Sequence, residues 1–238
     1  HGTDTLEETA YFLDLTLNVP SPVVITGAMR SSNEIGSDGL YNYISAIRVA
    51  SESSSENRGT LVVFNDEIHA ARYVTKTHTS NIATFQSPNR GPLGFITKDK
   101  VTYHHELYEQ DHLEIFNSNI KVGIIKTYAG IDNTLFNALL DAKYDGLVLE
   151  ALGQGNMPPS SLDGLNACID AGMKIVIVSR AFNGVVGKYY GYEGGGYNLG
   201  LRGVIFSNGQ NAQKARIALT LALSNIDNDE EIRAIFEK

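Results

Sequence analysis

Short runs of β-branched and aliphatic residues alternate with segments of helical period along most of this chain, and this alternation restricts its fold more than any other feature. In the first half, residues 23–29 (VVITGAM) and 60–65 (TLVVFN) are predicted to form buried strands, with a helix at 39–51 between them. Two βα units in succession favour a mainly parallel sheet of the α/β class. The apolar face of the helix is predicted from four residues at helical spacing: Tyr43, Ile44, Ile47 and Ala50.

The second half repeats the alternation more regularly. Its predicted strands are 121–126, 147–151, 174–179 and 203–207. Its predicted helices are 134–144, 162–171, 211–223 and a short C-terminal one within 227–238, and a loop is expected at 189–197. This pattern predicts a parallel βα domain whose ligands bind beyond the carboxyl ends of the strands.

A less regular region separates the two halves. Residues 67–102 are rich in Thr, His and Asn and are predicted to form shorter strands and loops. Residues 104–119 are polar and have no clean period, which is typical of a linker between domains. We therefore expect one α/β domain over residues 1–103 and a second over residues 120–238.

The first nine residues, HGTDTLEET, combine a turn, reactive side chains and a helix start. Thr5 and Glu8 match the S/T-x-x-E capping box, which predicts a helix from residue 6 to about residue 17 with Thr5 as its N-cap. Gly2, Thr3 and Asp4 then lie in the turn, where backbone N–H groups and the helix dipole favour an anion or a developing oxyanion. The spacing alone favours the simpler interpretation, in which Asp4 and Thr5 are capping residues.

Two other local patterns leave a structural and a functional interpretation open. Alternating threonines at 75, 77 and 79 place Lys76 on the opposite face of an extended segment. Buried there, Lys76 would need a carboxylate partner, whereas the spacing favours an exposed lysine on an edge strand. The loop at 153–156 (GQGN) has neither the P-loop nor the dinucleotide-binding pattern, and Asn156 is either a turn residue or a donor to an amide or carboxylate.

Composition excludes several classes of function. The net charge is −8 without a long basic run, which argues against a nucleic acid or an anionic membrane as partner. No apolar run approaches the length of a bilayer span. A single cysteine, Cys168, and six scattered histidines form no recognised metal pattern, so neither a metal nor a cofactor is expected.

Several segments occur together in an order that is characteristic of one family. Residues 1–13 (HGTDTLEETAYFL) form a long and specific match to a signature of bacterial-type, type II-like L-asparaginases. The other matching segments are GAMR at 27–30, SDG at 37–39, VFND at 63–66, VTKT at 74–77, FQSPN at 85–89, GPLG at 91–94, GQGN at 153–156 and residues 211–216. The chain therefore resembles this family over essentially its whole length.

The resemblance implies a fold and a reaction. The fold is a larger N-terminal domain with a mixed sheet, of which residues 1–103 are a part, and a smaller C-terminal domain of parallel βα units. The reaction is amide hydrolysis, which converts L-asparagine, and more weakly L-glutamine, through a threonine acyl-enzyme with release of ammonia. The implied reaction uses neither a cofactor nor a metal.

The resemblance also assigns roles to residues of the first half. Lys76 would orient Asp4, while Thr3 and Asp4 would handle a proton or position water. The backbone N–H of Thr3 would suit an oxyanion hole, and Gly2 in the same turn would contact substrate. Asp4 would also hold the substrate α-ammonium, and the carbonyl of Ala28 would accept from the substrate amide.

Residues of the second half are assigned to a neighbouring subunit. Asn156 and Glu193 would complete the pocket from there, because the family is typically a homotetramer built as a dimer of dimers. The partners expected are thus an amino-acid substrate and further copies of the chain. The resemblance implies a periplasmic or secreted location, with the cytoplasm as the alternative.

The primary nucleophile of the family departs from this match. The family uses a threonine in a TGGTI-type motif, and residues 1–238 contain no such motif. The chain also begins with His1 and opens directly on a turn, so we expect that an N-terminal segment carrying the attacking threonine was removed or is supplied separately. Two alternatives to an amidohydrolase stay open: a non-catalytic module that binds asparagine or aspartate, and a subunit related to amidotransferases.

Overall fold

Two separate sheets organise the chain, one in each of its two units, His1–His112 and Leu113–Lys238. In the computed structural model, residues 1–106, 111–114 and 119–237 are described. The division between the units falls within the predicted linker at 104–119, part of which lies outside the described residues. The domain boundaries at residues 103 and 120 stay predictions.

The first unit contains a mixed sheet with strand order β1-β2-β3-β6-β7. Its strands are β1 (Val23–Ile25), β2 (Thr60–Phe64), β3 (Glu67–Ala70), β6 (Gly94–Ile96) and β7 (Val101–Tyr103). Only β1 and β2 pair in parallel, and the remaining neighbours are antiparallel. A separate antiparallel pair is formed by β4 (Thr75–Lys76) and β5 (Phe85–Gln86).

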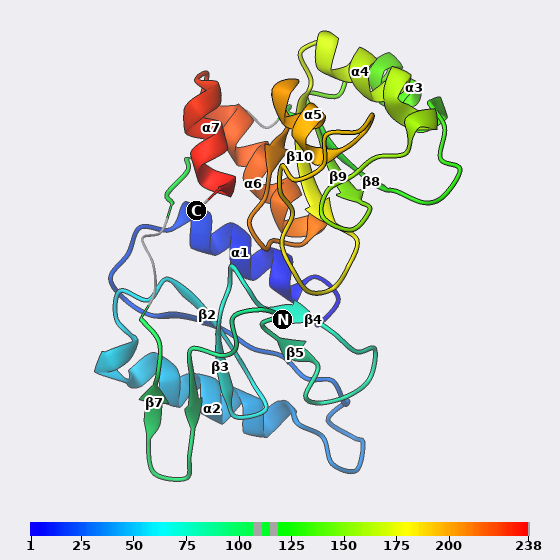
Figure 1. Cartoon of the computed structure of the whole chain (residues 1–238). Coiled ribbons are helices and arrows are strands. Elements are labelled where there is room, and N and C mark those ends of the chain that lie inside the picture. The colour runs from blue at the N-terminus through cyan, green and yellow to red at the C-terminus, as the bar shows by residue number, and fades with distance from the viewer. Residues whose placement is uncertain (107–110, 115–118, 238) are drawn as a thin grey trace. The chain divides into compact units, whose positions relative to one another are not determined.

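Two helices cover opposite faces of this sheet (Figure 1). They are α1 (Leu6–Thr16) and α2 (Gly39–Ser51), and a short 3₁₀ turn, η1 (Ser53–Ser55), follows α2. Strand β2 is buried along its whole length, so its side chains alternate between two cores: Val62 and Phe64 pack with α1, and Leu61 and Val63 with α2. This central strand fixes the position of both helices.

The face of α2 that the sequence pattern marked as apolar is not the buried one. Tyr43, Ile44 and Ile47 are each about half exposed, at 59%, 49% and 48%, and Ala50 is exposed too. The buried residues are Asn42, Ser45, Ala46 and Val49. The hydropathy pattern failed here because the Asn42 amide is satisfied by hydrogen bonds to Gly27, Asp38 and Asn65, and burial of a fully bonded polar group is inexpensive.

The second unit contains a four-stranded parallel sheet with order β11-β10-β9-β8. Its strands are β8 (Val122–Lys126), β9 (Gly146–Ala151), β10 (Lys174–Ser179) and β11 (Ile205–Phe206). The helices are α3 (Thr134–Asp141), η2 (Pro159–Ser161), α4 (Leu162–Asp170), α5 (Gly196–Leu201), α6 (Ala212–Asn225) and α7 (Asp229–Phe236). Helix α5 begins at residues 196 and 197, the last two of the predicted loop at 189–197, and continues beyond it.

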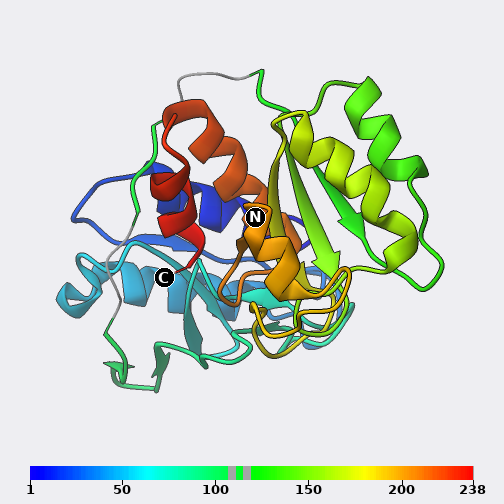
Figure 2. The same cartoon turned by 45° about the horizontal axis from the view of Figure 1, so that its top comes forward.

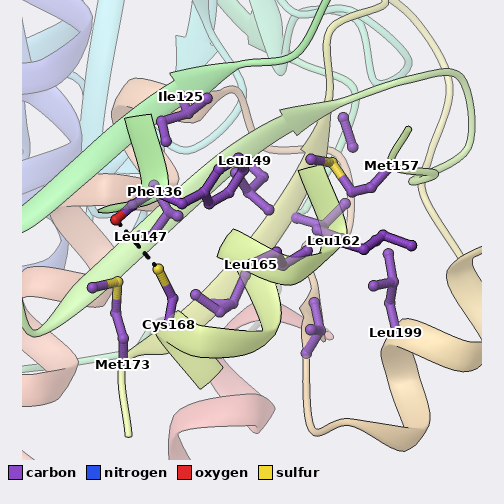
Figure 3. Packing of buried hydrophobic residues seen from close by; sticks show 14 of the residues in the cluster. Ile125, Phe136, Leu147, Leu149, Met157, Leu162, Leu165, Cys168, Met173 and Leu199 are labelled. Atoms are coloured by element: carbon purple, nitrogen blue, oxygen red, sulfur yellow. Dashed lines mark hydrogen bonds between the residues drawn. The ribbon is translucent and has the colours of Figure 1, made fainter. Parts of the chain in front are cut away.

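Helices lie on both faces of this parallel sheet (Figure 2). On one face, residues of α3, α4 and α5 pack with β9 and β10 around Phe136 and Leu165 (Figure 3). On the other face α6 approaches closely, because a side chain at Gly146 would meet Leu219 and Leu223 of α6 at 2.9 and 3.1 Å. The expected α/β class, with a mixed sheet in the first domain and a parallel sheet in the second, is confirmed.

The core of the second unit gives a direct stability test. Phe136 is 0% exposed, and its neighbour Leu135 on the same helix is 43% exposed. We expect Phe136→Ala to destabilise the unit by about 3–5 kcal/mol, because truncation leaves a cavity in a packed core. Urea unfolding followed by circular dichroism measures the change. Leu135→Ala is the matched control, and an equal loss in the two variants would contradict this packing.

Candidate active site

The opening turn lies directly before α1, as the sequence predicts. Thr3, Asp4 and Thr5 form the turn, and the Thr5 carbonyl accepts from the N–H groups of Glu8 and Thr9, each at 3.1 Å. Thr5 is the N-cap, but its side chain makes no capping hydrogen bond, so the predicted capping box is wrong in this respect. The backbone at Thr5 (φ −125°, ψ 13°) is not the extended conformation that a capping side chain normally requires. The turn is anchored instead by the buried face of α1.

Lys76 lies against this turn. Its Nζ donates to Thr3 Oγ1 at 2.9 Å and to Asp4 Oδ1 at 3.0 Å. The Lys76 side chain is 20% exposed, whereas that of Asp4 is 96% exposed. Lys76 is thus a largely covered ammonium paired with a carboxylate, and the interpretation as an exposed edge-strand lysine is wrong. The geometry gathers a hydroxyl, a carboxylate and an ammonium, the groups needed for proton transfer and for orientation of water.

Glu7 holds the backbone of Lys76 in place, and it was not identified from the sequence. It is 5% exposed, and its Oε1 accepts from Thr75 Oγ1 at 3.0 Å and from the Lys76 backbone N–H at 3.2 Å. Glu7 lies in the first turn of α1, whereas Lys76 lies in a distant strand, so no local spacing indicated this contact. The carboxylate therefore joins α1 to the short strand β4, which carries Lys76.

A second contact region links β5 to β3. His69 Nδ1 and Ser87 Oγ are 2.9 Å apart, and Gln86 Nε2 donates to Glu67 Oε2 at 3.4 Å. His69 Nε2 lies 3.3 Å from Glu67 Oε2, and this nitrogen forms no hydrogen bond with the described residues. The His69 imidazole lowers the pKa of Glu67 from its ordinary value, against partial burial, which raises it. Because β5 pairs with β4, these contacts between β5 and β3 also help to hold β4, the strand that carries Lys76.

Ala28 lies on the loop after β1, beside the opening turn. Gly27 comes so close to the turn that a side chain there would meet the His1 carbonyl at 2.3 Å. Ala28 itself is exposed, and no hydrogen bond among the described residues uses its carbonyl. Gly2 is exposed as well. The first unit thus gathers five residues that were singled out in the sequence: Gly2, Thr3, Asp4, Ala28 and Lys76.

Asn156 and Glu193 belong to the second unit, on two loops that contact one another. Asn156 Oδ1 accepts from the Gly196 N–H at 3.1 Å, and the Met157 N–H donates to the Gly194 carbonyl at 2.8 Å. Asn156 follows two glycines at positive φ, Gly153 and Gly155, in a tight turn beyond the carboxyl end of β9. The Asn156 side chain therefore has a structural hydrogen bond. Glu193, which directly precedes Gly194, is exposed.

Neither a metal site nor a membrane span is found in the described part of the chain. Residues 1–106, 111–114 and 119–237 contain no cluster of three or more His, Cys, Asp or Glu residues that could hold a metal ion. No helix among them is both long and apolar enough to cross a bilayer.

Comparison with known proteins decides the family. Residues 1–109 match the family described as asparaginase, N-terminal, and residues 121–236 match the glutaminase/asparaginase C-terminal domain. The chain belongs to the asparaginase family. It is an enzyme of the L-asparaginase, or amidohydrolase, type, and the resemblance seen in its motifs is confirmed.

Curated relatives match this family member over its whole length. L-asparaginase 2 of Escherichia coli strain K12 is 40% identical, across 100% of this chain and 69% of the relative. A protein of Haemophilus influenzae named probable L-asparaginase periplasmic is also 40% identical, across 100% of this chain and 68% of the relative. L-asparaginase 2 of Bacillus subtilis is 37% identical, across 100% of this chain and 63% of the relative.

The Glu67–His69 contact in this asparaginase-family chain predicts a pH dependence of stability. Because the folded pKa of Glu67 lies below its ordinary 4.5, the contact is fully stabilising above about pH 4.5 and is lost as the pH falls through the folded pKa. We expect Glu67→Gln to be less stable than the unmodified protein at pH 6, with the difference shrinking below pH 4.5. Urea unfolding at several pH values measures it. Glu56→Gln, on an exposed turn, is the control. A pH-independent difference for Glu67→Gln would contradict the contact.

Proposed function

We propose that this chain is part of an enzyme that hydrolyses the side-chain amide of L-asparagine to aspartate and ammonia, and that of L-glutamine more weakly. One observation carries the proposal: the Lys76 ammonium lies within hydrogen-bond distance of both Thr3 Oγ1 and Asp4 Oδ1. The names of the relatives, which are L-asparaginases, support the choice of substrate.

The reaction proceeds through two acyl-transfer steps. A threonine hydroxyl attacks the amide carbon, and collapse of the tetrahedral intermediate releases ammonia and leaves a threonine ester. Water then attacks the ester, which releases aspartate and regenerates the hydroxyl. In both steps negative charge develops on the former carbonyl oxygen, and the Thr3 N–H, close to the N-terminus of α1, is suited to stabilise it.

The first unit supplies the second catalytic group in this scheme. Lys76 holds Asp4 and Thr3 in fixed orientation, so that they transfer a proton or position the attacking water. The Asp4 carboxylate is almost fully exposed and is therefore available for the substrate α-ammonium. Gly2 and the Ala28 carbonyl complete the substrate contacts of this unit, Ala28 by accepting from the amide nitrogen.

The attacking threonine is assigned outside residues 1–238 in this proposal. None of the segments that match the family carries the TGGTI-type motif. The proposed reaction therefore takes place in the native protein that supplies this motif, and turnover is measured on that protein.

The proposal also includes a site shared between subunits. Asn156 and Glu193 complete the pocket from a neighbouring copy within a homotetramer. Their two loops are held together by the Gly196–Asn156 and Met157–Gly194 hydrogen bonds, which supports a common role. We propose a periplasmic location, in line with the name of the Haemophilus influenzae relative.

Substitution of the Lys76 group tests the reaction. We expect Lys76→Met and Asp4→Asn to lower kcat for asparagine by about 100-fold to 10,000-fold, the usual contribution of positioned proton transfer. Ammonia release measured on the native protein reports the change. Lys98→Met, which removes an exposed lysine, is the matched control and should retain full activity.

Two outcomes would overturn this proposal. Unchanged turnover in Lys76→Met would contradict the role of Lys76. Asparagine binding by the native protein without ammonia release would show a binding module, in which these substitutions change affinity alone.

Mixing of inactive variants tests the shared site. Glu193→Ala is expected to be impaired alone, and co-expression with Lys76→Met should restore about a quarter of the native activity, because one site of each mixed pair keeps both residues. Co-expression of Lys76→Met with Asp4→Asn is the control and should restore nothing, since both changes lie in the first unit. Absence of recovery in the first mixture would contradict a site shared between subunits.

A further inference from the structure

Of the three successive carbonyl groups of residues 26–28, only one accepts no hydrogen bond from the described residues. The Thr26 carbonyl accepts from the His1 backbone nitrogen at 2.8 Å, and the Gly27 carbonyl accepts from Asn42 Nδ2 at 3.0 Å. The next carbonyl, that of Ala28, has no partner among the described residues. An exposed carbonyl without a partner is an acceptor that a ligand can use.

Asp38 holds the peptide group that carries this carbonyl. Its side chain is almost completely covered, with the residue 9% exposed. The Met29 N–H donates to Asp38 Oδ1 at 3.1 Å and to Oδ2 at 3.0 Å, and the Arg30 N–H donates to Oδ1 at 2.9 Å. Although Asp38 is the N-cap of α2, its side chain does not cap that helix. The carboxylate is directed instead at the loop after β1.

The Asp38 carboxylate is itself fixed by a buried amide. Asn42 Nδ2 donates to Asp38 Oδ2 at 3.0 Å, and Asn42 Oδ1 accepts from the Asn65 N–H at 3.2 Å. Asn42 is 1% exposed and lies on the buried face of α2. The loop is therefore tied to a helix and to the end of β2, which are rigid parts of the first unit.

The hydrogen bond from the Met29 N–H to Asp38 also fixes the direction of the Ala28 carbonyl. No described residue has a cis peptide bond, and in a planar trans peptide the N–H and C=O groups point in opposite directions. Because the Met29 N–H points at Asp38, the Ala28 carbonyl of the same peptide must point away from it. Hydrogen bonding of the N–H to a carboxylate also strengthens the carbonyl as an acceptor.

We propose that Asp38 is a positioning residue that aims the Ala28 carbonyl at the substrate amide nitrogen and so favours amides over esters. The inference rests on the proposed amide hydrolysis. An amide presents an N–H donor to the carbonyl, whereas the matching ester has none. Asp38 therefore contributes to amide hydrolysis and not to ester hydrolysis, although both substrates yield the same acyl-enzyme.

The test compares L-asparagine with L-aspartic acid β-methyl ester on the native protein. We expect Asp38→Ala to lower the ratio of kcat/KM for the amide to kcat/KM for the ester by about three- to tenfold, the effect of one lost hydrogen bond. Asp38→Asn, which keeps one accepting oxygen, should lower the ratio less. The ratio does not depend on how much of a variant is folded, since both substrates use the same active molecules. If Asp38→Ala does not fold, Asp38→Asn decides the question.

Asp14→Asn is the matched control, because Asp14 also accepts a backbone N–H, that of Thr60, at 2.8 Å. This variant should leave the ratio unchanged. An unchanged ratio in the Asp38 variants, or an equal loss for amide and ester, would overturn the inference. If the native protein hydrolyses no amide at all, the proposed function fails instead, so the two failures are distinguishable.

Discussion

The contact on which the candidate site depends is that of one ammonium with the opening turn. Lys76 is 72 residues away from Asp4 in the chain, and the fold brings its Nζ within 3.0 Å of the carboxylate. Because Asp4 is almost fully exposed, the pair contributes little to stability. Its effect is geometric: the ammonium holds a hydroxyl and a carboxylate in one arrangement. The two-residue strand β4 is too short to achieve this alone, and it depends on Glu7 on one side and on its pairing with β5 on the other.

Buried carboxylates support both parts of the first unit's site. Glu7 fixes the backbone of Lys76, and Asp38 fixes the peptide between Ala28 and Met29. Asp38 accepts from two backbone N–H groups, and Glu7 accepts from one backbone N–H and the Thr75 hydroxyl, which offsets much of the cost of burial. Asp4 and Ala28, the residues proposed to meet a substrate, are exposed, while Glu7 and Asp38 are covered. The exposed groups therefore stay accessible on loops, while carboxylates next to or within α1 and α2 hold the backbone near them in place.

The elements of regular structure were largely predictable from the sequence. The helix at 39–51 and the strand at 174–179 agree with the prediction at both ends, because period and apolar content are local signals. Three details were wrong for physical reasons. The Thr5 side chain does not cap α1, the buried face of α2 is centred on Asn42 instead of Ile44, and α5 begins at the last two residues, 196 and 197, of the predicted loop. At Thr5 the backbone conformation does not suit a capping side chain. At α2 and α5 tertiary hydrogen bonds outweighed the local preference, those of Asn42 in α2 and the Asn156 bond to Gly196 at the start of α5.

The sequence by itself determined the α/β class, the family and the residue types available for catalysis, since these depend on local periodicity and on motifs of adjacent residues. It also placed Thr3 and Asp4 in a turn before a helix. Only the tertiary structure decided, against the local spacing, that Lys76 is paired instead of exposed, and that Glu7 and Asp38 bind the backbone N–H groups of Lys76 and Met29. The physical reason is that a hydrogen bond between distant residues leaves no periodic trace in the sequence. Its partners are set by the packing of α1, β2 and α2, which brings the turn, the hairpin and the loop together.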